Sequence, residues 1–354
     1  MPWMVLAAIF LLSLCFRVAE PGFAPKEMAE NLWTGLRLQW ARVFKLPLFL
    51  DRWDIIGSRP YYYEAFLRLK NSLVTCFSGM ALCMAGAAYQ TVFQNPLASP
   101  NTLGITAGVK LGNVVFVLVF AWDAIANLHT RYLYCYGFSA VILLLILLAG
   151  KLAGYKSRSF SVLDMVLVGV MMTQLCDAVA GFLEYRLESQ SFVLLMVYQQ
   201  LSLGALTRFD DLSMLLFVVM IVLSLIPILL VRYRFNATAF TDDEALMMGV
   251  HPQRLRFVGM ACGSILALTA LIHCGDIGLL AMAVPHICRY WVGSDFRKLC
   301  AVSMAAGGVL LLIGRIVSSL VIVAGVEPPV NFFVSLAIVP LFILALLSRR
   351  NSFA

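Results

Sequence analysis

Charged side chains are scarce in this chain, and long apolar runs are abundant. Asp, Glu, Lys and Arg together make up 13% of the 354 residues, whereas hydrophobic residues make up 62%. Several uninterrupted apolar runs approach the ~20 residues that a helix needs to cross a bilayer. A soluble domain could not bury so many such runs. The composition therefore predicts an all-α polytopic membrane protein.

Motifs for nucleotide binding and catalysis are missing as well. Gly150-Lys151 has neither the upstream glycine spacing nor the following Ser or Thr of a phosphate-binding loop. No Ser-His-Asp set and no pair of carboxylates argues for an enzyme. If ATP drives this protein, the ATPase is a separate chain, and we expect this chain itself to bind no cofactor.

The cysteines and the net charge exclude two further classes of protein. None of the nine cysteines forms a CxxC pair and most lie in apolar segments, which predicts free, buried thiols rather than disulfides or metal ligands. The net charge of +7 comes from basic residues that form no continuous patch, so nucleic acid is not an expected partner.

Basic residues instead collect in alternate loops, which predicts an orientation. Four arginines lie between positions 232 and 256, and Arg349-Arg350 lie near the end of the chain. The opposite loops hold acids or mixed charge, and Arg131 falls in one of them. Because basic loops stay in the cytoplasm, we expect both termini there. The long mixed-charge region 20–70 is then expected outside.

The apolar runs form eleven segments, of which the weakest, 191–206, is expected to be short or half-inserted. The first could be a secretory signal. It lacks a preceding basic residue and a small-x-small cleavage site, so a retained membrane helix is favoured. The segments are 2–19, 70–92, 103–122, 134–152, 161–183, 191–206, 212–231, 255–274, 278–292, 300–322 and 332–348.

A polar break between two apolar helices is the most distinctive stretch. One helix arrives at Gln90 and breaks at Asn95-Pro96-Leu97-Ala98-Ser99-Pro100, where two prolines remove backbone donors. The next helix carries Gly104, Gly108 and Gly112 on one face, which lets another helix pack closely. Polar breaks in membrane helices often mark a substrate path, although an ordinary turn between spans is the alternative interpretation.

Two histidines near helix ends are not expected to bind a metal or haem. His286 follows Pro285 at a second predicted helix break, and we expect a structural or gating role there rather than metal binding. His273 and Cys274 lie near the outer end of a span. Contact with haem is disfavoured there, because adjacent residues of a helix point to different faces.

A short helix with complete start and stop signals follows position 240. Thr241 can cap it, Glu244 completes a capping box, and Gly249 can end it. A capped acidic helix flanked by arginines is suited to lie in a groove of a partner, although a solvated loop helix has the same pattern. The segment comprises Thr241, Asp242, Asp243, Glu244, Ala245, Leu246, Met247, Met248 and Gly249.

Three ionisable residues fall within predicted spans, where they are costly and usually functional. Lys110 is close enough to a helix start for its ammonium to reach the membrane surface. Asp177 is the acid that a proton-coupled transporter could use, and pairing with a neighbouring helix is the alternative. The third is Arg315.

Three motifs together resemble one family. NPLASP followed by a glycine-spaced helix, TDDEALMMGV at 241–250, and GDIGLLAMAVPHICRYWVGSDFRK at 275–298 occur in the order seen in FecCD-type permeases. These permeases belong to bacterial ABC importers of iron siderophores, haem and vitamin B12. The resemblance covers roughly residues 65 to 350.

The resemblance implies a fold, partners and site residues. It implies one permease domain over 1–354, with about ten transmembrane helices of the type II ABC importer fold, in the bacterial cytoplasmic membrane. Its partners would be a second permease in a homodimer or heterodimer, two ATPase subunits that bind ATP, and an extracytoplasmic solute-binding protein. The loop 236–254 would hold the coupling helix. The translocation path would include Gln90, Asn95, Pro96, Leu97, Gly104, Gly108, Gly112, Pro285 and His286.

The chain departs from the family at its outer face. Arginines expected to dock the binding protein are replaced by Asn71 and Ser318, while Arg68 stays in place and Arg315 is displaced. The enlarged loop 20–70 is a candidate for taking over part of this contact. Two other functions stay open: an ion-coupled secondary transporter that uses Asp177, and a non-transporting membrane scaffold or receptor. The motifs do not specify which chelate is carried.

Overall fold

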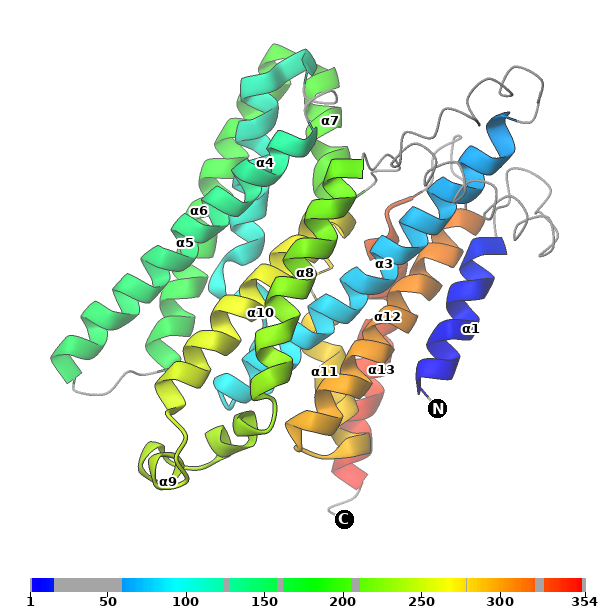
Figure 1. Cartoon of the computed structure of the whole chain (residues 1–354). Coiled ribbons are helices and arrows are strands. Elements are labelled where there is room, and N and C mark those ends of the chain that lie inside the picture. The colour runs from blue at the N-terminus through cyan, green and yellow to red at the C-terminus, as the bar shows by residue number, and fades with distance from the viewer. Residues whose placement is uncertain are drawn as a thin grey trace, which may run out of the picture.

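A computed structural model describes residues 2–15, 59–123, 128–157, 162–204, 211–277, 279–321 and 328–351. Within these ranges the regular structure is helical throughout (Figure 1). The α-helices are α1 (Pro2–Cys15), α3 (Arg59–Val92), α4 (Ile105–Phe120), α5 (Leu128–Ser157), α6 (Val162–Gln190), α7 (Phe192–Leu203), α8 (Asp211–Val231), α9 (Asp242–Met247), α10 (Pro252–Cys274), α11 (Leu280–Val292), α12 (Phe296–Leu320) and α13 (Val330–Asn351). Short 3₁₀ turns η3 (Pro100–Leu103), η4 (Ala121–Asp123) and η5 (Arg234–Ala239) join some of them.

Seven of the described helices are long and apolar enough to cross a membrane, and they agree with the predicted spans. They cover Leu69–Val92, Ile105–Asp123, His129–Ile146, Leu167–Gln190, Leu212–Val231, Pro252–Cys274 and Phe296–Leu320. Two shorter apolar stretches accompany them among the described residues, Phe192–Leu203 in α7 and Val330–Ala345 in α13. The predicted weak segment is α7, which is short as expected, with 12 residues.

The outward faces of several helices are apolar. On α6, Met171 and Phe182 are exposed, as are Leu223 and Leu230 on α8. A soluble protein rarely exposes so much apolar surface, whereas lipid is a suitable solvent for it. These apolar faces are therefore suited to contact the lipid of a membrane.

Helix α3 occupies the middle of one half of the bundle, beside α10, α11 and α12 (Figure 1). Tyr89 of α3 is completely buried, and its hydroxyl is hydrogen-bonded to Ser264 of α10 at 2.5 Å. Gly86 approaches α11 so closely that an added Cβ would overlap the carbonyl oxygen of Ala281. These contacts fix α3 against both α10 and α11.

Pro285 lies inside α11 and does not break it, contrary to the prediction. Proline lacks an N–H, so the carbonyl four residues earlier, that of Ala281, receives no helical hydrogen bond from it. Gly86 packs against this same carbonyl. Helix α3 therefore packs against the carbonyl that Pro285 leaves without a donor. Sequence alone would predict a helix break at this proline.

The glycine stripe of α4 packs as predicted. An added Cβ on Gly108 or Gly112 would lie 2.6 Å from the Cα of Ser139 or Cys135, both on α5. Gly104 precedes α4 with a left-handed φ of 68° and contacts α5 and α6. The stripe therefore brings α4 and α5 into close contact.

In Figure 1 the described end of α13 lies toward the end of the bundle that carries α9, whereas the described end of α1 lies beside α12 and farther from α9. Residues 16–58, which hold most of the enlarged outer loop with Trp33 and Trp40, lie outside the described residues.

Candidate transport pocket and coupling helix

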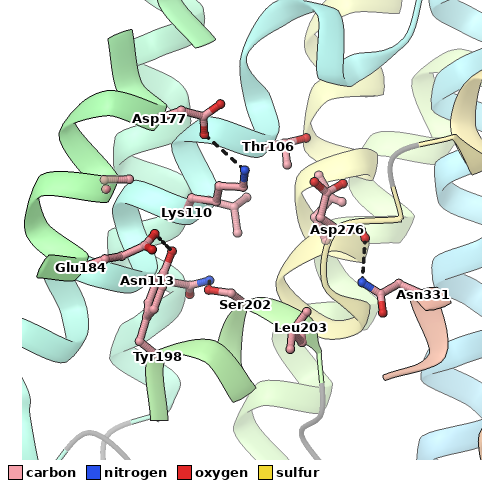
Figure 2. Close-up of a pocket in the computed structure, with 14 residues that line it drawn as sticks. Thr106, Lys110, Asn113, Asp177, Glu184, Tyr198, Ser202, Leu203, Asp276 and Asn331 are labelled. Carbon is pink, nitrogen blue, oxygen red and sulfur yellow. Dashed lines mark hydrogen bonds and ion pairs between the residues drawn. The ribbon is translucent and has the colours of Figure 1, made fainter. Parts of the chain in front are cut away.

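Helices α4, α6 and α7 enclose a pocket together with the α10–α11 turn and the start of α13 (Figure 2). Its volume is about 470 Å³. The lining mixes small, apolar and ionisable side chains: Thr106, Val109, Lys110, Asn113, Asp177, Ala180, Gly181, Glu184, Tyr198, Ser202, Leu203, Leu271, Asp276 and Asn331. A concave site with converging polar groups is a reasonable candidate for ligand binding.

One ion pair joins two walls of this pocket. Lys110 Nζ of α4 lies 3.2 Å from Asp177 Oδ1 of α6, and the two side chains are 39% and 36% exposed (Figure 2). The expectation that Lys110 extends to the membrane surface is therefore wrong. The ammonium stays between helices because the carboxylate of Asp177 offers it a partner there. For Asp177, pairing with a neighbouring helix was the alternative expectation, and the structure has this pair.

A second acid is held by a tyrosine. The hydroxyl of Tyr198 on α7 donates to Glu184 Oε1 of α6 at 2.6 Å. Close by, Asn113 Nδ2 of α4 donates to Ser202 Oγ at 3.5 Å. Short α7 thus contributes its polar face to the pocket.

Asp276 is the third acid of the pocket, and no special role was predicted for it. It follows Gly275 in the turn after α10, and its backbone carbonyl accepts from Asn331 Nδ2 at 3.2 Å (Figure 2). Burial raises the pKa of the Asp276 carboxyl, while Lys110 lowers it and Asp177 raises it further. Its place in the signature GDIG was the one available signal. Sequence reasoning read Asp276 only as an acid of an outer loop.

A buried arginine fixes the helix ends that border the pocket. Arg131 of α5 is 2% exposed, although it was predicted to lie in an outer loop. Its guanidinium donates to Asn113 Oδ1 at 2.8 Å and to the carbonyls of Leu201 and Ile272 at 2.9 Å each. These carbonyls lie near the C-termini of α7 and α10, where the helix dipole favours a cation. This compensation explains why the charge is buried.

None of the predicted path residues lines this pocket. Gln90, at the end of α3, donates to the carbonyl of Met282 in α11 at 2.8 Å. The adjacent Gln94 donates to the carbonyl of Thr238 in η5, and Thr238 Oγ1 donates to the carbonyl of Thr91 at 3.2 Å. The end of α3, immediately before NPLASP, is therefore bonded to the segment that leads into α9.

Asn95 and His286, two further predicted path residues, have hydrogen-bond partners within the chain, and so does His273. Asn95 Oδ1 accepts from the backbone N–H of Leu97 at 2.9 Å, which closes the turn around Pro96. Tyr290 Oη lies 3.0 Å from Nε2 of His286, which is 9% exposed. His273 is buried, with Nε2 2.6 Å from Tyr132 Oη and Nδ1 2.7 Å from the carbonyl of Thr269. Each of the two histidines therefore has a hydrogen-bond partner within the protein.

Helix α9 has the predicted capping box. The side chain of Thr241 accepts from the backbone N–H of Glu244, and Glu244 Oε2 accepts from the backbone N–H of Thr241 at 2.9 Å. These hydrogen bonds lower the pKa of the Glu244 carboxyl. Asp242 forms a bidentate pair with Arg256 of α10, at 2.8 and 3.1 Å. Two of the three acids thus build and anchor the helix.

The outer surface of α9 is available to a partner. Met247 is 88% exposed, and Leu246, Met248 and Asp243 are exposed too, whereas Ala245 faces the protein. Gly249 follows with a left-handed φ of 74°. A small helix that presents apolar side chains at one end of the bundle fits a docking element.

The positions expected to dock a binding protein differ in exposure. Asn71 and Ser318 are buried, with only 7% and 3% of their surface exposed. Neither side chain is therefore accessible to a partner. Arg315 is half-buried on α12. Arg68 lies in the first half of α3, and its side chain is outside the described part of the protein.

Comparison with known proteins gives one family and one fold. The FecCD transport family matches residues 5–348. An ABC transporter permease protein of Methanocaldococcus jannaschii is 30% identical over 289 residues, which cover 79% of this chain and 80% of that protein. An iron chelatin transport system permease protein of Helicobacter pylori is 28% identical, over 80% of this chain and 82% of that protein.

Further relatives differ in the cargo that their names state. The hemin transport system permease protein of Yersinia pestis is 28% identical, over 80% of this chain and 83% of that protein. A solved chain described as a metal-chelate type ABC transporter in an inward-facing conformation superposes with a TM-score of 0.76. The aligned region covers 98% of this chain and 97% of the solved chain. At 20% sequence identity, this likeness supports the fold.

Proposed function

The chain belongs to the FecCD transport family, and we propose that it is the permease subunit of a binding-protein-dependent ABC importer of metal chelates. ATP would be bound and hydrolysed by a separate ATPase subunit. Two permeases would form one translocation path between two ATPases inside and a solute-binding protein outside. The cargo would be an iron siderophore, haem or a cobalamin-like chelate, in line with the names of the relatives.

Helix α9 is the observation that carries this proposal. It is short, capped at its N-terminus, anchored to α10 by the Asp242–Arg256 pair and exposed on its far side. A helix fixed in this way can transmit a force from a partner to α10, because its own hydrogen bonds resist bending. Through Thr238, the segment before it is also bonded to the end of α3.

The proposal assigns the α9 end of the bundle to the cytoplasm. The basic residues between 232 and 256 surround α9, and the positive-inside rule places such residues in the cytoplasm. Both termini then lie in the cytoplasm of the bacterial cell, with the pocket nearer the opposite, outer face.

A crosslink from α9 tests the function directly. We would replace Met247 with cysteine, treat native membranes with a short bifunctional reagent and identify the attached peptides by mass spectrometry. We expect peptides of an ATPase subunit. Trp122→Cys, which is 70% exposed in η4 at the opposite end, is the matched control and should attach no ATPase. An ATPase attached equally at both positions, or at neither, would contradict the proposal.

A further inference from the structure

The pocket holds more acid than its described cation can neutralise. Asp177, Glu184 and Asp276 contribute three carboxylates, and Lys110 contributes one ammonium. Lys110 is already bound by Asp177, and Glu184 already accepts from Tyr198. Such an excess of negative charge favours a cationic ligand over an anionic one, although solvent screens it in part because Lys110 and Asp177 are 39% and 36% exposed.

Two acceptor atoms of the pocket have no donor. Asp276 Oδ1 and Asn331 Oδ1 are both buried and make no hydrogen bond within the described residues. Leaving a buried acceptor unpaired costs about 1–3 kcal/mol, so a donor supplied by water or by a ligand would stabilise both atoms. Both atoms need a donor, which a ligand group with N–H or O–H bonds would bring.

The three acids lie on different sides of the pocket. Figure 2 shows Asp276 on the side formed by the α10–α11 turn and Asn331, facing Lys110 and Asp177 across the pocket, with Glu184 below them. The volume of about 470 Å³ between these walls admits part of a chelate rather than a bare ion. Within the described ranges, no group of three His, Cys, Asp or Glu side chains is arranged to hold a metal ion.

We propose that this pocket is a subsite for a positively charged, donor-bearing group of the transported chelate, with Asp276 as its principal acceptor. The inference rests on the proposed transport function and narrows its cargo to cationic chelates. Lys110 acts as an internal competitor, because its ammonium occupies Asp177 until the cargo group arrives. An anionic chelate would instead meet Asp276 and Glu184, and like charges repel at short range.

The test uses two inert cobalt complexes of opposite charge. Hexaamminecobalt(III) is cationic and rich in N–H donors, whereas tris(oxalato)cobaltate(III) is anionic and has only acceptors. Neither exchanges its ligands readily, so binding reports charge and hydrogen bonding alone. The full-length permease, in nanodiscs of phosphatidylcholine, would be titrated with each complex by calorimetry. We expect saturable binding of the cation and none of the anion.

Three variants separate this subsite from general charge effects. Asp276→Asn should weaken binding of the cation about tenfold, because one unit charge near the ligand is lost. Lys110→Gln should strengthen it, because the competing ammonium is gone. Glu188→Gln removes a charge from the same helix as Glu184, but Glu188 is exposed outside the pocket lining, so binding should stay unchanged. Each variant must elute as a single species from a sizing column.

Several results would overturn the inference. They are an absence of saturable cation binding, equal binding of the anion, unchanged affinity in Asp276→Asn, and weaker rather than stronger binding in Lys110→Gln. The titration contains neither ATP nor an ATPase. Its failure would therefore leave the Met247 crosslink unaffected, and failure of the crosslink would leave the titration unaffected.

Discussion

Gly204 and Gly275 meet backbone to backbone where α7 and α10 end beside the pocket. An added Cβ on Gly275 would lie 2.5 Å from the carbonyl carbon of Leu203. Both glycines have left-handed φ angles, 71° and 74°. Arg131 donates to a carbonyl three residues before each of them. The two helix ends are therefore fixed to each other and to α5.

This contact predicts a large effect of a single methyl group. Gly275→Ala should destabilise the fold by about 2–4 kcal/mol, because a left-handed alanine is strained and its Cβ overlaps Leu203. Gly293→Ala is the matched control, because Gly293 has a φ of 76° but open space around its Cβ. Its cost should be only the backbone strain of about 1–3 kcal/mol, because its φ of 76° and ψ of −167° lie in a region that essentially only glycine occupies. Melting midpoints in detergent would compare them, and equal shifts would contradict the packing argument.

Helix α9, as the proposed docking element for an ATPase, predicts different outcomes for its acids. Asp243 is exposed and forms no hydrogen bond or ion pair among the described residues, so Asp243→Lys should leave α9 intact while reversing its surface charge. We expect chelate-stimulated ATPase activity of the reconstituted importer to fall about tenfold, equivalent to ~1.4 kcal/mol of coupling. Unchanged stimulation would show that this surface does not dock an ATPase.

Thr241→Val is the companion variant, because it removes the cap without altering charge. Losing an N-cap costs about 0.5–2 kcal/mol, which is enough to fray a six-residue helix. Hydrogen exchange across residues 241–249 should rise in Thr241→Val and stay at the wild-type level in Asp243→Lys. Reversing Glu244 would not separate these effects, since its carboxylate is part of the capping box.

Uptake measured in proteoliposomes can distinguish ATP from an ion gradient as the energy source. In proteoliposomes loaded with ATP, uptake should stop when the partner ATPase is inactivated and persist when an uncoupler removes the proton gradient. Asp177→Asn should retain ATP-driven uptake, because in this proposal Asp177 binds Lys110 and cargo and carries no proton across the membrane. Collapse of uptake on uncoupling, with ATP held constant, would favour the secondary transporter instead.

The outer loop remains a prediction from sequence. With Asn71 and Ser318 buried, the residues at the two altered family positions offer no charged docking contact. We therefore propose that residues 30–55, with Trp33 and Trp40 as apolar anchors, bind the solute-binding protein. Replacing 30–55 by a short Gly/Ser linker should weaken binding of that protein in surface plasmon resonance. A change within twofold, ~0.4 kcal/mol, would make this stretch a membrane-surface element only.

Local signals were predicted from sequence most accurately. The capping box of α9 depends on residues three apart, and the glycine stripe of α4 depends on helical spacing, so both can be seen in the chain itself. The short α7 followed from the weakness of its apolar run. These features need no knowledge of which helices are neighbours.

Features that depend on distant partners were missed. Pro285 continues a helix whose neighbour α3 packs against the carbonyl left without a donor, and Gly86 lies 199 positions earlier in the chain. Asp276 gains its importance from Lys110 and Asp177, which belong to other helices. Arg131 resembled an outer-loop residue because its compensating carbonyls carry no sequence signature.

The bonds of Arg131 also bear on the order in which the protein is made. Its side-chain partner Asn113 is synthesised before it, but the carbonyls of Leu201 and Ile272 come 70 and 141 residues later. At typical rates of synthesis, the last of these emerges on the order of 10 s after the arginine. The guanidinium lacks two of its acceptors until Leu201 is made and still lacks one until Ile272 is made, so α5 has its full set of bonds only once α10 is present. Insertion of this half of the bundle must therefore be completed by α10 rather than helix by helix.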